Sequence, residues 1–418
     1  MEVREGYKNT EVGVIPEDWE IRSLEYLCIP AGLVRGPFGG ALKKEYFVKS
    51  GYKVYEQRNA IYKNSSIGNY YINKNKFDEL IRFAVKQDDF IISCSGTIGK
   101  IFKIPKNHEQ GIINQALLKL SLDSSKVVNK FFEIYFSWDR FQYKIIDSTQ
   151  GGAMKNLVGM DIFKKTLISI PPLPEQQAIA EALSDVDDLI SSLTKLINKK
   201  KNIKQGAMQE LLTGKKRLEG FSGDWEKKNL GFIVDFLKGS GLSKAKLSIK
   251  GKYKCLLYGE LFTTYGEVID SVISSTNYKE GTVSNKGDIL MPGSTTTIGI
   301  DLAIASSLNI EDVLIGGDIN ILRPKVELNS EFLARYLSNV KKFQISQATQ
   351  GITIIHLYAK DLSEMLIELP CLSEQTAIAN ILSDMDAEIE VLEQKLNKYK
   401  TIKQGMMQEL LTGKIRLI

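Results

Sequence analysis

Few residues of this chain could perform acid–base or nucleophilic chemistry. It has only two histidines, His108 and His356, and they do not occupy equivalent positions of the sequence repeat described below. A lone histidine in an apolar run such as ITIIHLY is more often structural than catalytic, although it could also face a base edge. The segment SGTIGK at 95–100 lacks the glycine spacing of a Walker phosphate loop and the Ser or Thr that follows its lysine. We therefore predict no catalytic site.

Metal and cofactor chemistry is not indicated either. The cysteines are far apart and form no paired motif, so we expect small buried thiols in a reducing compartment. These are Cys28, Cys94, Cys255 and Cys371. Asp161 and Asp361 recur at equivalent positions, as helix caps or turn residues. No metal site is predicted. No GxGxxG loop lies between a strand and a helix, and no Asn-Pro-Pro-aromatic methyltransferase motif occurs, so no cofactor is predicted on this chain.

Phosphate contact is the chemistry that the residue types favour. Two basic stretches begin with glycine-rich pieces, RGPFGGALKK at 35–44 and KGSGLSKAK at 238–246, and glycine lets a backbone approach a ligand closely. Tyrosines are interleaved with the first stretch, a mixture that suits phosphate contact with stacking or base-edge readout. One such stretch could be a solvated lysine-rich loop, but two at matching positions favour nucleic acid. The predicted contacts are Arg35, Lys43, Lys44, Lys53, Arg58, Lys63, Lys74, Lys76, Lys238, Lys244, Lys246, Lys250, Lys252 and Lys254.

Two further segments share the tripeptide Thr-Gln-Gly and are candidate base-reading loops. Their alternative interpretation is a structural turn that both halves share because they share a fold. The predicted contacts are Thr149, Gln150, Lys155 and Asn156 in the first loop and Thr349, Gln350, Thr353 and His356 in the second.

An internal duplication organises these residues. Residues 175–218 and 374–417 align at an offset of 199 without a gap, and twenty-eight of the forty-four aligned positions are identical. Weaker matches continue upstream, with DWE at 18–20 and 224–226, and TIG at 97–99 and 297–299. Each half therefore has an Asp-Trp-Glu entry, a divergent body and a well-preserved tail.

The preserved tails have the apolar spacing of a coiled coil. Apolar residues recur at alternating steps of four and three over about three heptads, which predicts one long helix per copy. A helix packed onto the core of its own domain is the alternative. The predicted interface residues are Ile179, Leu183, Val186, Ile190, Leu193 and Ile197 in the first copy and Ile378, Leu382, Met385, Ile389, Leu392, Leu396 and Tyr399 in the second.

Charge predicts that the two helices are antiparallel. Residues 175–194 carry five acids and no Lys or Arg, whereas residues 195–218 carry eight bases and one acid. Residues 374–393 and 394–417 repeat this asymmetry. An antiparallel pair places acidic halves beside basic halves, while a parallel pair would stack like charges. A helix of about 38 residues rises roughly 57 Å, so the pair could act as a ruler between the bodies.

Sequence patterns within the two divergent bodies predict the fold class. DDFIISCSGTIGKIFKI and GDILMPGSTTTIGIDLAIA are typical of short strands broken by turns, and NKFFEIYFSW and SEFLARYLSNV of short helices. The predicted class is α/β, with two pseudo-repeated domains that have mainly β cores and are joined by two long antiparallel coiled-coil helices. Composition is ordinary for a globular protein, at 43% apolar and 25% charged residues with a net charge of +5. The sequence shows no membrane-spanning run or signal peptide, so a cytoplasmic protein is expected.

Several segments of the sequence resemble those of a known protein family. VGVIPEDWEI at 12–21, PPLPEQQAIAEALSDVDDLI at 171–190, LPCLSEQTAIANILSDMDAEI at 369–389 and the two QELLTGK tails resemble the DNA specificity (S) subunit of type I restriction–modification systems. The resemblance covers the whole chain. One departure is Ser373, where the family has proline, and it could loosen the start of the second helix.

The resemblance implies that each body is a target recognition domain that reads one half of a split double-stranded DNA site. It also implies a non-catalytic subunit that binds two methyltransferase (M) and two restriction/translocase (R) subunits, which carry S-adenosylmethionine, ATP and Mg. The expected segments are 1–174 and 216–373 for the recognition domains and 175–215 and 374–418 for the helical regions. Two alternatives remain open: a coiled-coil scaffold without DNA contact, and a self-sufficient restriction enzyme or a fragment of one.

Overall fold

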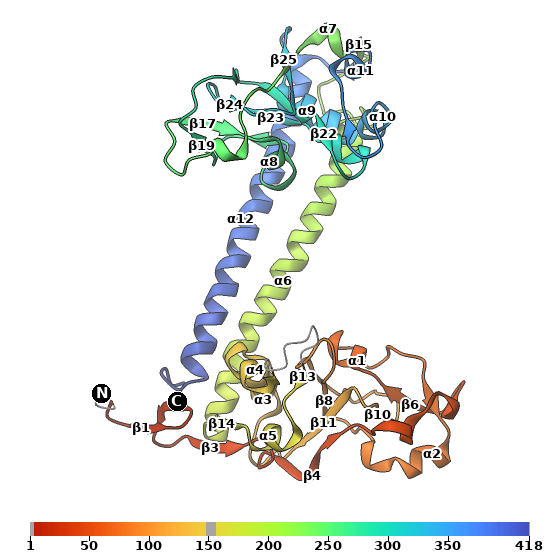
Figure 1. Ribbon diagram of the computed structural model, residues 1–418, viewed down its shortest axis with the longest axis vertical. Helices are drawn as coiled ribbons and strands as arrows, with labels where there is room; N and C mark the ends of the chain where they lie inside the picture. Colours follow the sequence, from red (N-terminus) through yellow and green to blue (C-terminus); the bar gives the residue numbers. More distant parts are fainter. Residues whose placement is uncertain (1–3, 148–155, 418) are drawn as a thin grey trace. The chain divides into compact units, whose positions relative to one another are not determined.

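The computed structural model describes residues 4–147 and 156–417, and the chain divides into two compact units. Unit 1 consists of residues 1–193 and 395–418, and unit 2 of residues 194–394. Each unit therefore contains one divergent body together with parts of both long helices (Figure 1). The compact units thus divide the chain differently from the predicted segments, in which each helix is a region of its own.

The two long helices are α6 (Leu173–Leu211) and α12 (Leu372–Leu410), each of 39 residues. They begin at equivalent positions of the repeat, so Ser373 does not displace the start of α12. Gly214 and Gly413 follow the helix ends with φ of +66° and +69°, the left-handed geometry of a helix C-cap.

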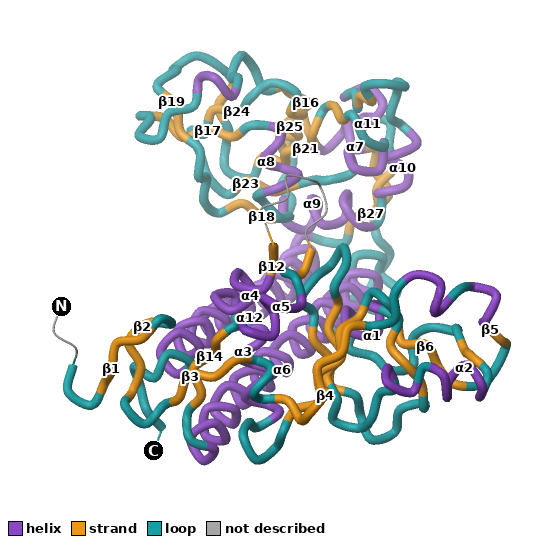
Figure 2. The backbone as a smooth tube through the Cα atoms, turned by 60° about the horizontal axis from the view of Figure 1, so that its bottom comes forward, coloured by secondary structure: helices purple, strands orange, loops and turns teal. Residues whose placement is uncertain are grey.

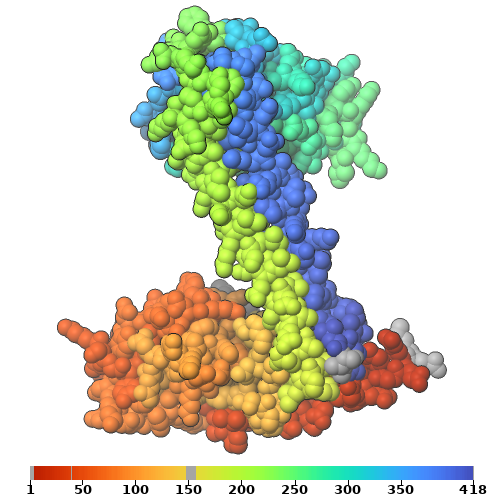
Figure 3. Space-filling model, turned by 180° about the vertical axis from the view of Figure 1, so that it is seen from behind, coloured from red at the N-terminus to blue at the C-terminus, as the bar shows by residue number. Residues whose placement is uncertain are grey.

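Antiparallel pairing of the helices is confirmed within each unit. In unit 1 the Lys403 Nζ lies 2.6 Å from Asp187 Oδ1. In unit 2, Lys200 pairs with Glu388 at 2.6 Å and Lys201 with Glu393 at 2.7 Å. Each pair joins the acidic first half of one helix to the basic second half of the other, as the charge pattern predicts. In both units the helices run side by side (Figures 1 and 3).

The body of unit 1 has a mainly β core. Two four-stranded sheets have the strand orders β4-β11-β8-β9 and β10-β6-β7-β5, and only β10 and β6 pair in parallel within them. Strands β3 and β14 pair beside the start of α6. The strands are β1 (Tyr7–Thr10), β2 (Gly13–Pro16), β3 (Glu20–Ser23), β4 (Cys28–Arg35), β5 (Phe47–Val48), β6 (Tyr52–Tyr55), β7 (Tyr71–Ile72), β8 (Phe90–Ser93), β9 (Ile101–Lys103), β10 (Gly111–Ile113), β11 (Leu117–Leu122), β12 (Ile146–Asp147), β13 (Asn156–Leu157) and β14 (Leu167–Ile170). The helices of the body are α1 (Gln57–Ile61), α2 (Lys74–Glu79), α3 (Asn129–Ser137), α4 (Asp139–Ile145) and α5 (Met160–Lys165).

The body of unit 2 repeats this plan (Figure 2). Its main sheet has the strand order β16-β25-β21-β23-β18, and a smaller sheet has the order β19-β17-β24-β20. The strands are β15 (Glu226–Asn229), β16 (Val234–Lys238), β17 (Tyr253–Leu256), β18 (Val268–Ile269), β19 (Ser275–Thr276), β20 (Thr282–Val283), β21 (Asp288–Pro292), β22 (Ser294–Thr295), β23 (Ser306–Leu308), β24 (Leu314–Ile315), β25 (Ile319–Pro324), β26 (Ile355–His356) and β27 (Leu366–Leu369). The helices of the body are α7 (Leu230–Ile233), α8 (Tyr258–Thr263), α9 (Ser330–Asn339), α10 (Lys342–Gln347) and α11 (Ala359–Ser363).

Equivalent helices anchor the two cores. On α3, Phe131, Phe132 and Phe136 are buried, because apolar residues spaced by one, four and five positions share one helix face. On α9, Phe332 and Leu333 are buried in the same way. The helices predicted from NKFFEIYFSW and SEFLARYLSNV are therefore present.

The predicted helix-interface residues fall into two groups. The first residues of each helix pack into the core of the adjoining body, as the alternative interpretation expects: Ile179 and Leu183 in unit 1, and Ile378 and Leu382 in unit 2. Farther along, Leu193, Ile197 and Ile389 are buried. The others are half-buried, namely Val186, Ile190, Met385, Leu392, Leu396 and Tyr399.

Candidate nucleic-acid interface

Most of the first basic stretch lies at the surface of unit 1. Lys43, Lys44, Lys63 and Lys74 are exposed, and so is Arg58. Several of these groups have carboxylate neighbours: Lys43 lies 3.7 Å from Glu45, Lys63 lies 3.1 Å from Glu133, and Arg58 lies 3.1 Å from Glu56. Arg35 is half-buried and donates to the carbonyl oxygen of Gln115 at 3.3 Å. Exposed ion pairs of this kind are weak, so a phosphate could replace the carboxylates.

The structure corrects the prediction for two members of this stretch. The Lys53 side chain is fully buried, and its Nζ donates to Glu109 Oε1 at 2.6 Å, which lowers the pKa of Glu109. Lys76 is also buried, with its Nζ 2.8 Å from Glu79 Oε1 and 4.1 Å from the centre of the Tyr46 ring. Lys53, Val54 and Tyr55 of β6 are all buried, so both faces of this strand are covered, and sequence charge alone does not show this. We leave both residues out of the proposed contacts.

The second stretch is exposed throughout. All six predicted lysines belong to the surface of unit 2. Lys246 Nζ lies 3.5 Å from the centre of the Tyr278 ring, and Lys254 donates to the carbonyl oxygen of Val272 at 3.2 Å. The six side chains therefore form a cationic surface without an ion pair to a described carboxylate. They are Lys238, Lys244, Lys246, Lys250, Lys252 and Lys254.

A small recess beside the first stretch contains polar residues that the sequence patterns missed. It has a volume of about 200 Å³, and Lys44, Tyr70, Asn114 and Gln115 contribute to its lining. The amides come from the loop between β10 and β11, far from Lys44 in the sequence. Amide side chains can pair with base edges, so this recess is a candidate reading site. No charge or periodicity signal marks Asn114 or Gln115.

Only the second Thr-Gln-Gly loop lies within the described residues. Gln350 and His356 exchange backbone hydrogen bonds of 2.9 and 2.7 Å, and the Gln350 side chain donates to Asp361 at 3.0 Å. The hydroxyl of Thr349 donates to the carbonyl oxygen of Ser346. These bonds support the structural-turn interpretation for Thr349 and Gln350, whereas Thr353 is exposed. In the first loop, Thr149, Gln150 and Lys155 fall outside the described residues, and Asn156 is described only as backbone of β13.

In each unit, the repeated sequence motifs come together at one cluster of hydrogen bonds. In unit 1 the Glu175 carboxylate is fully buried and accepts two hydrogen bonds from Arg416, at 2.6 and 2.9 Å, and one from Trp19 Nε1 at 2.8 Å. Arg416 also forms a fork with Asp18 at 3.0 and 2.7 Å and lowers the pKa of that carboxyl. These bonds connect Arg416, which follows α12, to the start of α6 and to the Asp18-Trp19 segment that precedes β3. We term this connection the Arg416 junction.

Unit 2 contains the equivalent connection, which we term the Arg217 junction. Arg217 donates two hydrogen bonds of 2.6 Å to the buried carboxylate of Glu374, and one to the carbonyl oxygen of Gly223. Trp225 lies here as Trp19 does in unit 1, but its Nε1 has no partner among the described residues. The end of each long helix therefore secures the body at the start of the other helix.

The glutamine that follows each junction glutamate forms hydrogen bonds with backbone groups of the adjoining body. Gln176 accepts from the Val128 N–H at 2.8 Å and donates to the Pro171 carbonyl at 2.9 Å. Gln375 makes the matching bonds to Asn329 and Pro370, at 3.0 and 2.8 Å. These bonds tie the starts of α3 and α9 to the long helices, which explains the preserved Glu-Gln pair.

No group of three or more His, Cys, Asp or Glu residues in the described ranges has a metal-ligating arrangement. Over the same ranges, no helix is long and apolar enough to cross a membrane. Cys28, Cys94 and Cys255 are buried free thiols, and burial raises their pKa values, whereas Cys371 is exposed.

Each of the two matching bodies thus presents an exposed basic stretch and is fastened to both long helices. A family model described as the type I restriction modification DNA specificity domain matches residues 16–205 and 222–401, one match for each half. The chain therefore belongs to this family and is a specificity subunit of a type I restriction–modification system.

Relatives and solved structures agree with this assignment. The chain is 26% identical over 351 residues to the type I restriction enzyme MjaVIII specificity subunit of Methanocaldococcus jannaschii, covering 80% of each protein. It is 23% identical to the EcoBI specificity subunit of Escherichia coli, over 74% of this chain and 69% of that protein. A crystal structure of a type I S subunit from M. genitalium matches with a TM-score of 0.57 at 17% identity, covering 98% of both chains, so the fold is shared.

Proposed function

We propose that this specificity subunit reads a two-part DNA site, with one body contacting each half and the helices setting the gap between the halves. The helices would also dock two methyltransferase subunits, and the complex would recruit two restriction/translocase subunits. In this proposal the chain itself is not catalytic, and S-adenosylmethionine, ATP and Mg act on the partners.

The observation that carries the proposal is the pair of matching junctions. The Arg416 and Arg217 junctions hold two divergent bodies in equivalent ways on preserved helices. The bodies, which would contact DNA, differ in sequence, whereas the helices that carry them are preserved. Each helix has 39 residues and rises about 58 Å, a length of about 17 base pairs at 3.4 Å each. The site would therefore contain unread pairs between its halves.

Neutralising four exposed lysines is expected to weaken DNA binding by the complex with the methyltransferase. Each lost phosphate contact lowers the slope of log K against log salt by about 0.9, so the slope should fall by up to about 3.6. Binding constants measured by fluorescence anisotropy between 50 and about 200 mM salt would test this. The substituted residues are Lys43, Lys44, Lys244 and Lys246, each to alanine.

The matched control neutralises four other exposed lysines and should leave the slope within one unit of the wild-type value. Equal slopes for the test and control variants would support the scaffold alternative, in which the basic stretches do not contact DNA. The control lysines are Lys106, Lys165, Lys216 and Lys286.

A further inference from the structure

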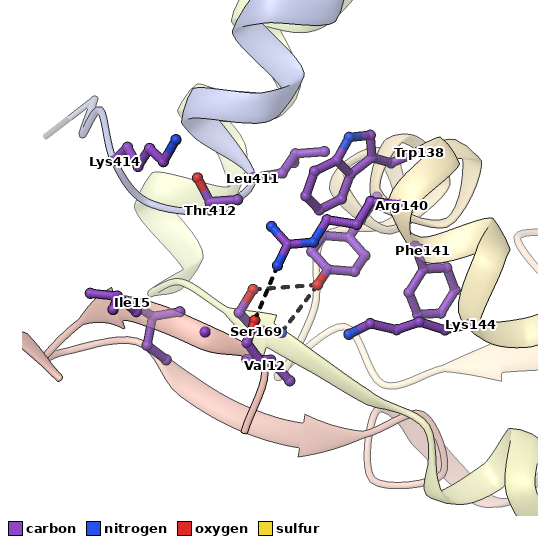
Figure 4. A pocket seen from close by; sticks show the side chains of 13 residues that line it. Val12, Ile15, Trp138, Arg140, Phe141, Lys144, Ser169, Leu411, Thr412 and Lys414 are labelled. Atoms are coloured by element: carbon purple, nitrogen blue, oxygen red, sulfur yellow. Dashed lines mark hydrogen bonds between the residues drawn. The ribbon is translucent and has the colours of Figure 1, made fainter. Parts of the chain in front are cut away.

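A pocket of about 160 Å³ lies inside unit 1 where three elements meet (Figure 4). One side is the hairpin of β1 and β2, another is formed by α3 and α4, and the third is the segment that follows α12. It is lined by Val12, Gly13, Val14, Ile15, Tyr135, Trp138, Arg140, Phe141, Lys144, Ser169, Leu411, Thr412 and Lys414.

The lining is cationic and contains no Asp or Glu. Lys414 already pairs with Glu409 at 3.4 Å. Arg140 makes one long hydrogen bond, 3.5 Å from its Nη2 to the carbonyl oxygen of Val12, and its guanidinium lies 5.6 Å from the Trp138 ring centre. The Lys144 side chain has no ion pair or hydrogen bond to any described residue. Two positive charges therefore share this pocket without a described carboxylate to balance them.

Arg140 and Lys144 are both exposed residues of the pocket lining, and their like charges interact. Partial burial, and secondly the charge of Arg140, lower the pKa of Lys144. The hydroxyl groups offer little compensation, because Tyr135 and Ser169 bond to each other and Thr412 donates to the carbonyl oxygen of Gln408. An anion between Arg140 and Lys144 would relieve the repulsion and gain charge-assisted hydrogen bonds.

The size and walls of the pocket restrict that anion. Pockets for drug-sized ligands are about 300–1,000 Å³, so this one suits a single side chain or a compact oxyanion. Val12, Ile15 and Leu411 supply apolar walls, which fit the methylene groups of an acidic side chain. A phosphate in duplex DNA is flanked by sugars on both sides, and such a backbone does not fit into a recess of this size.

A wider groove beside the pocket indicates where the anion comes from. The groove has a volume of about 740 Å³ and shares Trp138 and Arg140 with the pocket. Its remaining lining comes largely from α4, α6 and α12, including Asp187, Lys403 and Met407. A protein segment that lies along the helices of unit 1 would thus pass the mouth of the pocket.

Among the described residues, the second half of the chain does not repeat the hairpin that forms one wall of this pocket. The hairpin of β1 and β2 precedes Asp18-Trp19-Glu20, whereas the described residues 213–225 of unit 2 contain no strand. A partner that uses the pocket therefore distinguishes unit 1 from unit 2.

We propose that this pocket receives one carboxylate side chain, from an Asp or Glu of a protein partner that lies along α6 and α12 of unit 1. The methyltransferase subunit is the partner to test, and in that respect the inference rests on the proposed function. The guanidinium of Arg140 would donate two parallel hydrogen bonds to the carboxylate, and Lys144 would supply the second positive charge.

The test compares charge reversals in the full chain. In the double variant Arg140→Glu, Lys144→Glu, one of the two methyltransferase-binding events measured by isothermal titration calorimetry should be at least tenfold weaker, and the other should be unchanged. The neutral variant Arg140→Gln, Lys144→Gln should show a smaller loss, which separates charge from folding. The control Lys106→Glu, Lys165→Glu makes the same change in net charge at other exposed sites and should bind within twofold of wild type.

Acidic residues of the methyltransferase subunit, changed singly to lysine, should include one that restores binding to the double glutamate variant. Unchanged assembly in that variant would overturn the inference. Unchanged assembly with weaker DNA binding would also overturn it and assign the pocket to a phosphate. If the wild-type chain binds DNA but no methyltransferase subunit, this inference fails while the DNA-reading part of the proposed function stands.

Discussion

Replacing Arg416 with methionine is expected to destabilise unit 1 by about 3–5 kcal/mol, because it leaves the buried carboxylate of Glu175 without its cation. That carboxylate is fully buried, and of its three hydrogen bonds only the one from Trp19 would remain. Urea unfolding monitored by tryptophan fluorescence should show the loss, and hydrogen exchange should place it in unit 1.

Two variants control this result. Adding Glu175→Gln to Arg416→Met should recover part of the stability, since a neutral amide can still accept from Trp19 and costs less to bury. Arg217→Met should move the destabilisation to unit 2, where Glu374 is the buried carboxylate. Full stability of the Arg416→Met variant would show that the Arg416 junction does not hold the unit together.

Ending the chain after Gln394 is expected to prevent stable folding of unit 1, although this removes only the last segment of the sequence. The deletion takes Arg416 from the junction and Leu410 and Leu411, which are 4% and 0% exposed, from the core of unit 1. Each buried leucine contributes about 1.5–3 kcal/mol, and the unpaired carboxylate about 3–5 kcal/mol more. The sum is comparable to the whole stability of a typical domain.

Proteolysis followed by mass spectrometry would check this outcome. Residues from 4 to 147 should become sensitive to trypsin in the truncated chain, while the body of unit 2 stays protected. A chain that ends at Arg416 is the matched control, because Leu417 is partly exposed and the junction stays complete. Equal protection of both truncated chains would contradict the role assigned to the end of α12.

Sequence reasoning predicted the parts of this fold that depend on repetition and on charge along one helix. The offset of 199 residues located both helices, and the division into acidic and basic halves predicted their antiparallel pairing, which Lys403 and Asp187 show directly.

The sequence could not predict which residues far apart in the chain come into contact. The repeat words containing Trp19, Glu175 and Arg416 were recognised as preserved, but only the fold brings them to one junction. Lysine count likewise could not show that Lys53 points into the core toward Glu109, because burial depends on the neighbouring strands. Asn114 and the Arg140 pocket depend on loops and a hairpin whose positions have no sequence signal.

Methylome sequencing would show whether this chain directs methylation to a two-part DNA site. Cells that carry this chain and its methyltransferase subunit would be compared with cells that lack only this chain. We expect a new split motif in cells that carry the chain, methylated in both halves, with unspecified base pairs between the halves. Replacing the body of unit 2 with that of a related subunit should change one half of the motif and leave the other half and the gap intact. Methylation that is identical with and without this chain, although the chain is folded and bound to its partner, would contradict the account.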